Sequence, residues 1–210
     1  MNRICYANSI HATWCKNNVY EDALNDITNN NRSCDITEDL YIDGTLIINK
    51  SGIEGIGYGG ESRKKKFTSL TAVCNDNTKC VKIFANNTNN KNIILNNKQR
   101  SITTLSHDST GIIPAIELIK TDKKYNLIGD SGYIINPDKI NVYKHVTLIT
   151  YKKKNQKIQN NSNAKLKLAK RYKVENLFAK IKIFNRIHVR RDKKLITYLG
   201  FVYLGCISII

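Results

Sequence analysis

Three carboxylates stand at positions where a rigid element could hold them. Asp43 interrupts the apolar, β-branched run at residues 40–48, Asp130 ends the apolar run at 125–130, and Glu175 lies in a late amphipathic segment. Burying a carboxylate in such a strand is costly unless it is paired or bound to a metal ion. An aspartate that opens a turn with Gly44 is the alternative for Asp43, and the sequence around it favours neither.

Three acids are the oxygen ligands that a pair of Mg²⁺ or Mn²⁺ ions takes when the ions are shared with a substrate phosphate. Two ions roughly 4 Å apart activate the attacking oxygen and stabilise the leaving oxygen of an in-line displacement at phosphorus. The three acids therefore predict a phosphodiester enzyme with two divalent cations as cofactors.

The segment at residues 171–182 is predicted to be the helix that presents the last acid. Its apolar residues recur at the spacing of one buried stripe: Val174, Leu177, Phe178, Ile181 and, one turn on, Phe184. At 3.6 residues per turn, Arg171, Glu175 and Lys182 fall within about 40° of one another beside this stripe. One carboxylate thus stands between two cations at the edge of the core, although an ordinary solvated helix face has the same pattern.

The rest of the chain supplies elements that could position these residues. Apolar runs predict strands at 40–48, 67–73, 79–84, 125–130 and 146–151, the second and third joined as a hairpin; residues 106–119 predict a helix and 86–105 a loop. This order predicts an α/β fold with a mixed sheet flanked by helices. We expect residues 1–35 to be a short helical lead-in and residues 36–210 to form the catalytic domain.

A second candidate for the middle acid is Asp108, which follows His107. Asp108 or Ser109 suits the N-cap of the helix at 106–119, with Pro114 in its first turn. Such a polar capping context already explains Asp108, whereas Asp130 closes an apolar strand whose backbone would fix the carboxylate. Asp130 is therefore preferred, and a catalytic role for His107 is not indicated.

The charge of the chain indicates a polyanionic partner. The formal net charge is +17, from 34 Lys and Arg against 17 Asp and Glu, and such an imbalance favours nucleic acid over a membrane surface. The run from Arg63 through Lys64 and Lys65 to Lys66 suits contacts to a phosphate backbone. Over-use of Lys, Asn and Ile also fits an AT-rich coding genome, which would raise the charge without a functional cause.

Other features exclude several classes of site and compartment. The glycine-rich stretch at 50–60 lacks the spacing of a nucleotide-binding loop, and the six cysteines (Cys5, Cys15, Cys34, Cys74, Cys80 and Cys206) show no zinc-site spacing. Reduced thiols and the absence of a signal-peptide core indicate a protein of the cytoplasm, nucleoid or nucleus. The apolar tail at 195–210 is shorter than the ~20 residues that span a bilayer, so we expect a buried closing helix, with a tail anchor as the alternative.

These motifs, taken in order, resemble the DDE transposases of bacterial insertion sequences. Tyr-Ile-Asp43-Gly-Thr, Leu-Ile-Gly-Asp130-Ser-Gly-Tyr and Arg171-x3-Glu175-x6-Lys182 are similar to the three signature blocks of that family. The four-cation run and the His107-Asp108 pair are similar to blocks between the first two acids. The resemblance runs from about residue 40 to about residue 203, and the ordered set is more specific than any one block.

The resemblance implies an RNase H-like core that binds two Mg²⁺ or Mn²⁺ ions through Asp43, Asp130 and Glu175. It also implies double-stranded DNA as the partner, contacts to the DNA end by Arg171 and Lys182, and a homo-oligomer as the working assembly. The family often has a Tyr where this chain has Leu168, which removes one expected DNA contact. Only 42 residues precede Asp43, fewer than is usual in the family, so a truncated copy is expected.

Two other functions are compatible with the same residues. A decayed transposase that only binds DNA would keep the cations and lose the metal-dependent chemistry. A structural protein of the virion type, basic through genome composition alone, would show neither property.

Overall fold

The computed structural model describes residues 2–30, 38–59, 65–86, 88–95, 98–105, 107–119, 121, 123–151 and 161–210. Its strands are β1 (Glu38–Asn49), β2 (Gly57–Gly59), β3 (Lys65–Cys74), β4 (Cys80–Ala85), β5 (Thr88–Leu95), β6 (Lys98–Leu105), β7 (Tyr125–Gly129), β8 (Val146–Thr150) and β9 (Val189–Arg190). Its helices are α1 (Asn2–Lys16), α2 (Val19–Asn30), α3 (Ile112–Ile119), α4 (Pro137–Asn141), α5 (Ser162–Ala169), α6 (Tyr172–Ile181), α7 (Asn185–His188) and α8 (Leu195–Ser208), with short 3₁₀ turns η1 (Asp108–Gly111) and η2 (Ser131–Tyr133).

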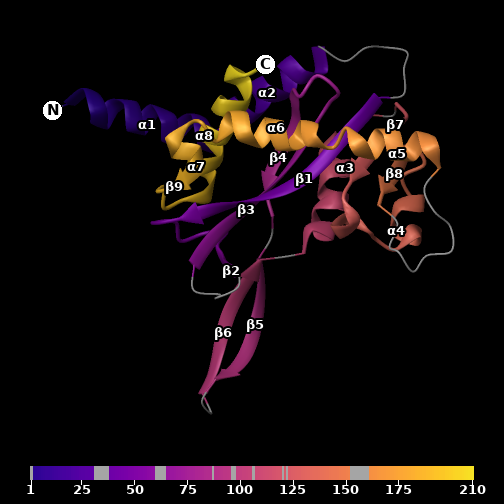
Figure 1. Ribbon diagram of the computed structural model, residues 1–210. Coiled ribbons are helices and arrows are strands. Elements are labelled where there is room, and N and C mark those ends of the chain that lie inside the picture. Colours follow the sequence, from indigo (N-terminus) through magenta and orange to yellow (C-terminus); the bar gives the residue numbers. More distant parts are fainter. Residues whose placement is uncertain are drawn as a thin grey trace.

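Strand β1 lies at the centre of one mixed sheet. It pairs antiparallel with β3 along one edge and parallel with β7 along the other. Outside them, β4 pairs antiparallel with β3, and β8 pairs parallel with β7. The order β4-β3-β1-β7-β8, flanked by helices (Figure 1), confirms the predicted α/β fold class and is consistent with an RNase H-like fold.

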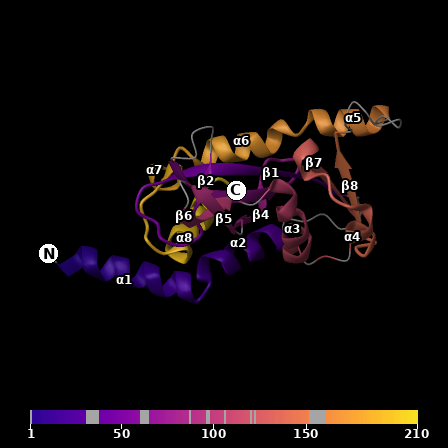
Figure 2. The same cartoon turned by 90° about the horizontal axis from the view of Figure 1, so that it is seen from below.

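The first half of β1 is covered on both faces, because its apolar residues alternate between two core clusters; farther along the strand, Leu46 and Ile48 are exposed. Tyr41 and Ile47 belong to the cluster with α6 and α8, whereas Leu40 and Ile42 belong to the cluster with α3. Successive side chains of a strand point to opposite faces, so odd-numbered β1 residues face α6. Figure 2 shows α5 and α6 along one side of the sheet and α3 on the other.

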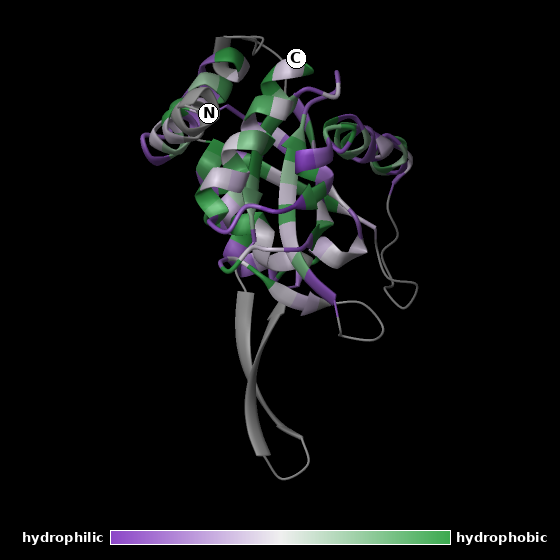
Figure 3. Cartoon of the chain, turned by 90° about the vertical axis from the view of Figure 1, so that its left-hand side faces the viewer, coloured by the Kyte–Doolittle hydropathy of each residue, from purple (hydrophilic) through white to green (hydrophobic). Residues whose placement is uncertain are grey.

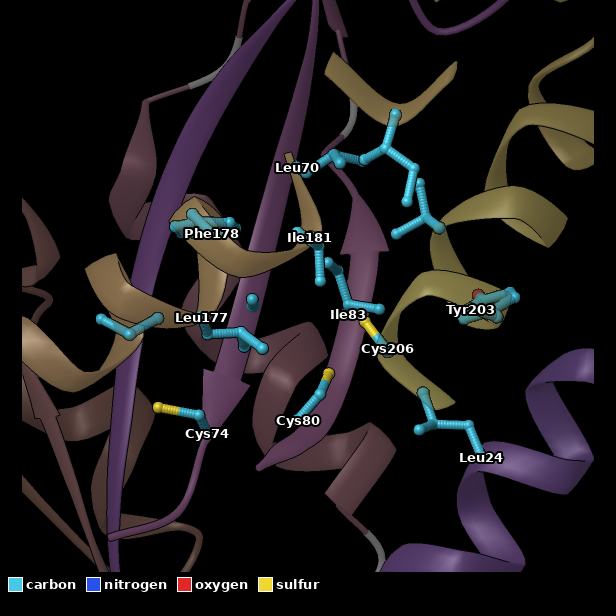
Figure 4. Packing of buried hydrophobic residues seen from close by; sticks show 14 of the residues in the cluster. Leu24, Leu70, Cys74, Cys80, Ile83, Leu177, Phe178, Ile181, Tyr203 and Cys206 are labelled. Atoms are coloured by element: carbon cyan, nitrogen blue, oxygen red, sulfur yellow. The ribbon is translucent and has the colours of Figure 1, made fainter. Parts of the chain in front are cut away.

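Helix α6 forms where the sequence predicts it and buries the predicted stripe of Val174, Leu177, Phe178 and Ile181. Figure 4 shows Leu177 and Ile181 of α6 packed with Ile83 of β4. The expected fifth member, Phe184, is 42% exposed, because the helix ends at Ile181 and Phe184 lies beyond its last turn. The stripe therefore fixes α6 over the sheet without that residue.

The apolar tail folds as the buried closing helix α8. Tyr198, Val202 and Cys206 are fully buried in it, and α1 and α2 pack against it. Within the described residues, no helix combines the length and the apolar character needed to cross a membrane. Figure 3 shows apolar residues concentrated in the sheet and in the helices packed on it.

The end of β1 is joined to the segment that precedes α8. Strand β9 pairs with Ile48 and Asn49 of β1. The fully buried Arg190 donates to the carbonyl oxygen of Glu54 at 2.6 Å and to the hydroxyl of Thr68 at 2.9 Å. One side chain thereby joins the loop after β1 to strand β3.

Besides Phe184, two sequence expectations were wrong: the loop at 86–105 and the N-cap of the helix that follows it. Residues 86–105, expected as a loop, contain the hairpin of β5 and β6, which pair over eight positions from Thr88–Leu105 to Leu95–Lys98 and extend away from the rest of the sheet (Figure 1). Ladder hydrogen bonds join backbone groups, so an Asn- and Lys-rich composition does not reveal them. The helix expected at 106–119 begins as the 3₁₀ turn η1, and its cap is His107, whose Nδ1 accepts from the amide of Ser109 at 3.3 Å.

Candidate active site

Asp43 lies on β1 at the level where its neighbour β7 ends. Tyr41 of β1 pairs with Ile128 of β7, so Asp43 and Asp130 both stand two residues beyond the same pair. In parallel strands, residues in register share a face, and both acids therefore point to the face that α6 covers. The structure thus brings the first two predicted acids to neighbouring positions.

Asp130 is held by the turn that follows β7. Its Oδ1 accepts from the amide of Gly132 at 2.7 Å and caps the turn η2. Asp43 makes a similar local contact, since its Oδ1 accepts from the amide of Gly44 at 2.8 Å. Each aspartate is therefore oriented by a backbone donor and keeps its second oxygen for other partners.

Arg171, at the start of α6, joins the first acid to the last. One guanidinium nitrogen donates to Oδ2 of Asp43 at 2.6 Å, and the other donates to Oε1 of Glu175 at 2.6 Å. The side chains of Asp43 and Arg171 are 19% and 23% exposed, whereas that of Glu175 is 54% exposed. Asp43, Arg171 and Glu175 form one cluster at the rim of the core; the helix geometry predicted that Arg171 and Glu175 lie side by side, and Asp43 joins them from β1.

Electrostatic shifts agree with this arrangement. The pKa of the Asp43 carboxyl is raised above its ordinary value, chiefly by burial; the Gly44 amide and Arg171 oppose the rise and Asp130 adds to it. Burial lowers the pKa of the Arg171 guanidinium, but Asp43, Glu175 and Asp130 more than reverse that effect and leave the pKa raised. Asp130 therefore influences both members of the Asp43–Arg171 pair.

Lys182, at the end of α6, binds β1 rather than an acid. Its ammonium group donates to Oγ1 of Thr45 at 2.5 Å, and burial lowers the pKa of this group. Thr45 lies two residues after Asp43, on the same face of β1. Arg171 and Lys182 thus lie along one line above the strand, at either end of α6.

Further acids near the start of β1 are also paired with cations of α5 and α6, which the sequence did not predict. Asp39 accepts from Lys167 of α5 at 2.6 Å. The hydroxyl of Tyr41 donates to Asp76 at 2.9 Å, and Asp76 also accepts from Lys173. Asp39, Tyr41, Asp43 and Thr45 are every second residue of β1, and this spacing in the sequence could have shown that their polar groups share one face. The lysines and the arginine that contact them could not be identified without the fold.

The three predicted acids do not form a compact ligand set. Within the described part of the chain, no three His, Cys, Asp or Glu side chains gather closely enough to hold a metal ion. Arg171 lies between Asp43 and Glu175 instead. The available ligand atoms are nevertheless all carboxylate oxygens, the type that hard divalent cations prefer. Asp43 and Glu175 already bind one cationic group, the guanidinium of Arg171.

The predicted basic run lies apart from this cluster. Arg63 and Lys64 fall outside the described residues. Lys65 and Lys66 are exposed at the start of β3. Asp43 pairs with Ala72 of β3, so Lys66 is six residues away along that strand, a distance of about 20 Å at ~3.3 Å per residue. The structure does not bring Lys65 or Lys66 to the acids.

The alternative middle acid, Asp108, has its side chain outside the described residues. Its neighbour His107 is exposed and contacts the hydroxyl of Ser109 at 3.0 Å.

The cysteines Cys15, Cys74, Cys80 and Cys206 are free and buried. Two cavities of about 360 and 420 Å³ are lined by other segments, the first between α1–α2 and α8 and the second between α4 and β8.

No protein-family model matches the chain, and no characterised protein sequence matches it. Among solved structures, the piggyBac transposase in a synaptic complex with hairpin DNA, determined by cryo-electron microscopy, is similar with a TM-score of 0.37 and 12% identity. The match covers 57% of this chain and 24% of that transposase.

Proposed function

We propose that this protein is a DNA transposase that uses Mg²⁺ or Mn²⁺ to hydrolyse and then join phosphodiester bonds. The observation that carries the proposal is the bridge from Asp43 on β1 through Arg171 to Glu175 on α6, with Asp130 beside Asp43. Three acids that are distant in sequence thus share one neighbourhood on one face of the sheet. The signature blocks that contain them support the same class of enzyme.

Asp43, Asp130 and Glu175 would hold the ions. When bound, the ions supply an activated water and neutralise the leaving oxygen at phosphorus. The Gly44 and Gly132 amides orient the two aspartates, and the long side chain of the exposed Glu175 can turn toward them. In the first reaction, water attacks phosphorus and the 3′ oxygen of the DNA strand leaves as a 3′-OH. In the second, that 3′-OH attacks a target phosphodiester, and the 3′ oxygen of the target strand leaves as a hydroxyl.

Arg171 and Lys182 would contact the DNA phosphates. Arginine suits a phosphate because its planar guanidinium donates two parallel hydrogen bonds. Both cations lie above β1 within one row with the acids, so a phosphate held there would be beside the reaction centre. The working assembly that we propose is a homo-oligomer on paired DNA ends.

Nicking of supercoiled plasmid tests this function. We expect nicking that depends on Mg²⁺ or Mn²⁺ and falls by at least about 10²-fold in each of the variants Asp43→Asn, Asp130→Asn and Glu175→Gln, because each removes an ion ligand. The exposed Asp138 of α4 provides the control: Asp138→Asn should nick as the wild type does. Equal nicking by all the variants would show that these acids are not the active site.

The second candidate is a DNA-binding protein without catalytic activity. The position of Arg171 between Asp43 and Glu175 favours it, since a charge-assisted pair can stabilise a site that no longer binds an ion. This candidate predicts salt-sensitive DNA binding and no heat of Mn²⁺ binding that depends on the three acids. Titration calorimetry with Mn²⁺ and duplex-binding measurements separate the two functions.

A further inference from the structure

Arg171 satisfies the same carboxylate oxygens that an ion would need. Its two nitrogens lie 2.6 Å from Oδ2 of Asp43 and 2.6 Å from Oε1 of Glu175. The other oxygen of Asp43 already accepts from the Gly44 amide. Asp43 is only 19% exposed, so little of its carboxylate remains for a second cation while Arg171 is in place.

A guanidinium and a divalent cation cannot both fill this position. Mg²⁺ binds oxygen at about 2.0–2.1 Å and requires near-octahedral ligands, so an ion between the two carboxylates would stand where the guanidinium is. The two cations would also repel each other across that distance. Binding of one therefore requires that the other leaves.

The place of Arg171 in the fold permits it to leave. It precedes the first residue of α6 and makes no side-chain capping bond there, and its side chain is 23% exposed. Helix α6 is held independently by Val174 and Leu177, both fully buried. The guanidinium can therefore rotate toward solvent without moving the helix that carries Glu175.

We propose that Arg171 competes with the divalent cation for Asp43 and Glu175. In the unbound state its guanidinium neutralises the two carboxylates and holds them together, and it thereby weakens ion binding. This rests on the proposed function, because it takes the acids to be the ion ligands. Arg171 here is a positioning residue: it keeps two like charges from separating until an ion replaces it.

Calorimetric titration of the full chain with Mn²⁺ alone, without DNA, tests the competition. We expect Arg171→Gln, which keeps hydrogen-bonding ability and removes the charge, to bind Mn²⁺ at least about tenfold more tightly than the wild type, since each of the two charge-assisted pairs lost from the unbound state is worth about that factor. Arg171→Ala should show the same direction, and thermal unfolding of both variants verifies that they are folded.

Lys182→Gln is the matched control. It removes one positive charge from the same row but releases a hydroxyl, Thr45, rather than a carboxylate. We expect it to change Mn²⁺ affinity much less than Arg171→Gln does. An equal gain in Mn²⁺ affinity in both variants would mean that net charge alone causes the effect, and it would refute the competition.

The remaining outcomes separate this inference from the function on which it rests. Mn²⁺ binding that is unchanged or weaker in the folded Arg171 variants, but lost in Asp43→Asn, would leave the ion site standing and refute the competition. If neither the wild type nor any Arg171 variant binds Mn²⁺, the ion assignment itself fails, and the competition fails with it.

Discussion

At the scale of single residues, Asp43 combines poor solvation with a position in the candidate site. Burial raises its pKa, and Asp130 raises it further, against the opposing effects of the Gly44 amide and Arg171. An acid whose pKa is raised on folding costs stability at every pH above its ordinary value. Functional sites commonly carry such a cost, because their charges are arranged for chemistry rather than for stability.

Asp43→Asn should therefore stabilise the fold at neutral pH. Because the pKa in the folded state is raised, native stability falls as pH rises from the ordinary value through the raised one, and the penalty is complete above it. We expect a higher Tm for Asp43→Asn than for the wild type at pH 7, and no difference near pH 3, where the carboxyl is protonated in both states. A Tm that is lower at pH 7 would mean that the pair with Arg171 outweighs the burial of Asp43.

At the scale of elements, α6 determines the position of Arg171, Glu175 and Lys182 through its buried face. We expect Leu177→Ala to lower the free energy of unfolding by about 2–5 kcal/mol, since it removes a fully buried side chain from the core. Asn176→Ala, on the exposed face of the same helix, should change it by no more than about 0.5 kcal/mol. Urea denaturation measures both, and equal small effects would contradict the assignment of the buried stripe.

The elements that the sequence could predict are those with a clear pattern of apolar residues. The strands β1, β3, β4, β7 and β8 are apolar and β-branched, and α6 has a clear helical period, so each was predicted. The β5–β6 hairpin depends on backbone pairing between Asn-rich segments and was missed. Phe184 was wrongly assigned to the core because spacing does not show where a helix ends.

The candidate site was predictable only as a set of residue types. Asp43, Asp130 and Glu175 stood out because each acid interrupts or borders an apolar pattern. Their meeting depends on the pairing of β1 with β7 and on the packing of α6 over β1, contacts that join residues more than 80 positions apart. Periodicity reports which face of an element is buried but not which element covers it, so the role of Arg171 as a bridge could not be foreseen.

At the scale of the whole molecule, the net charge of +17 should dominate DNA affinity. We expect duplex binding to weaken by about 10³-fold or more between 50 and 200 mM salt, the loss expected for about six phosphate contacts. Replacing Lys65 and Lys66 by Gln should reduce the slope of log K against log salt by about one for each lost contact. Lys139→Gln, at an exposed position of α4, is the control. An unchanged slope in the Lys65 and Lys66 double variant would mean that the start of β3 does not contact DNA.

The union of β1 with β9 has a consequence for how the protein is made. Strand β1 leaves the ribosome long before β9 does, and one edge of its far end stays open until residues 189 and 190 have been synthesised; the buried Arg190 arrives with them. Contacts of such long sequence separation close slowly and late. The strand that carries Asp43 therefore matures only after residues 189 and 190 have been translated, and a nascent chain stalled before that point would expose an unfinished sheet edge to chaperones.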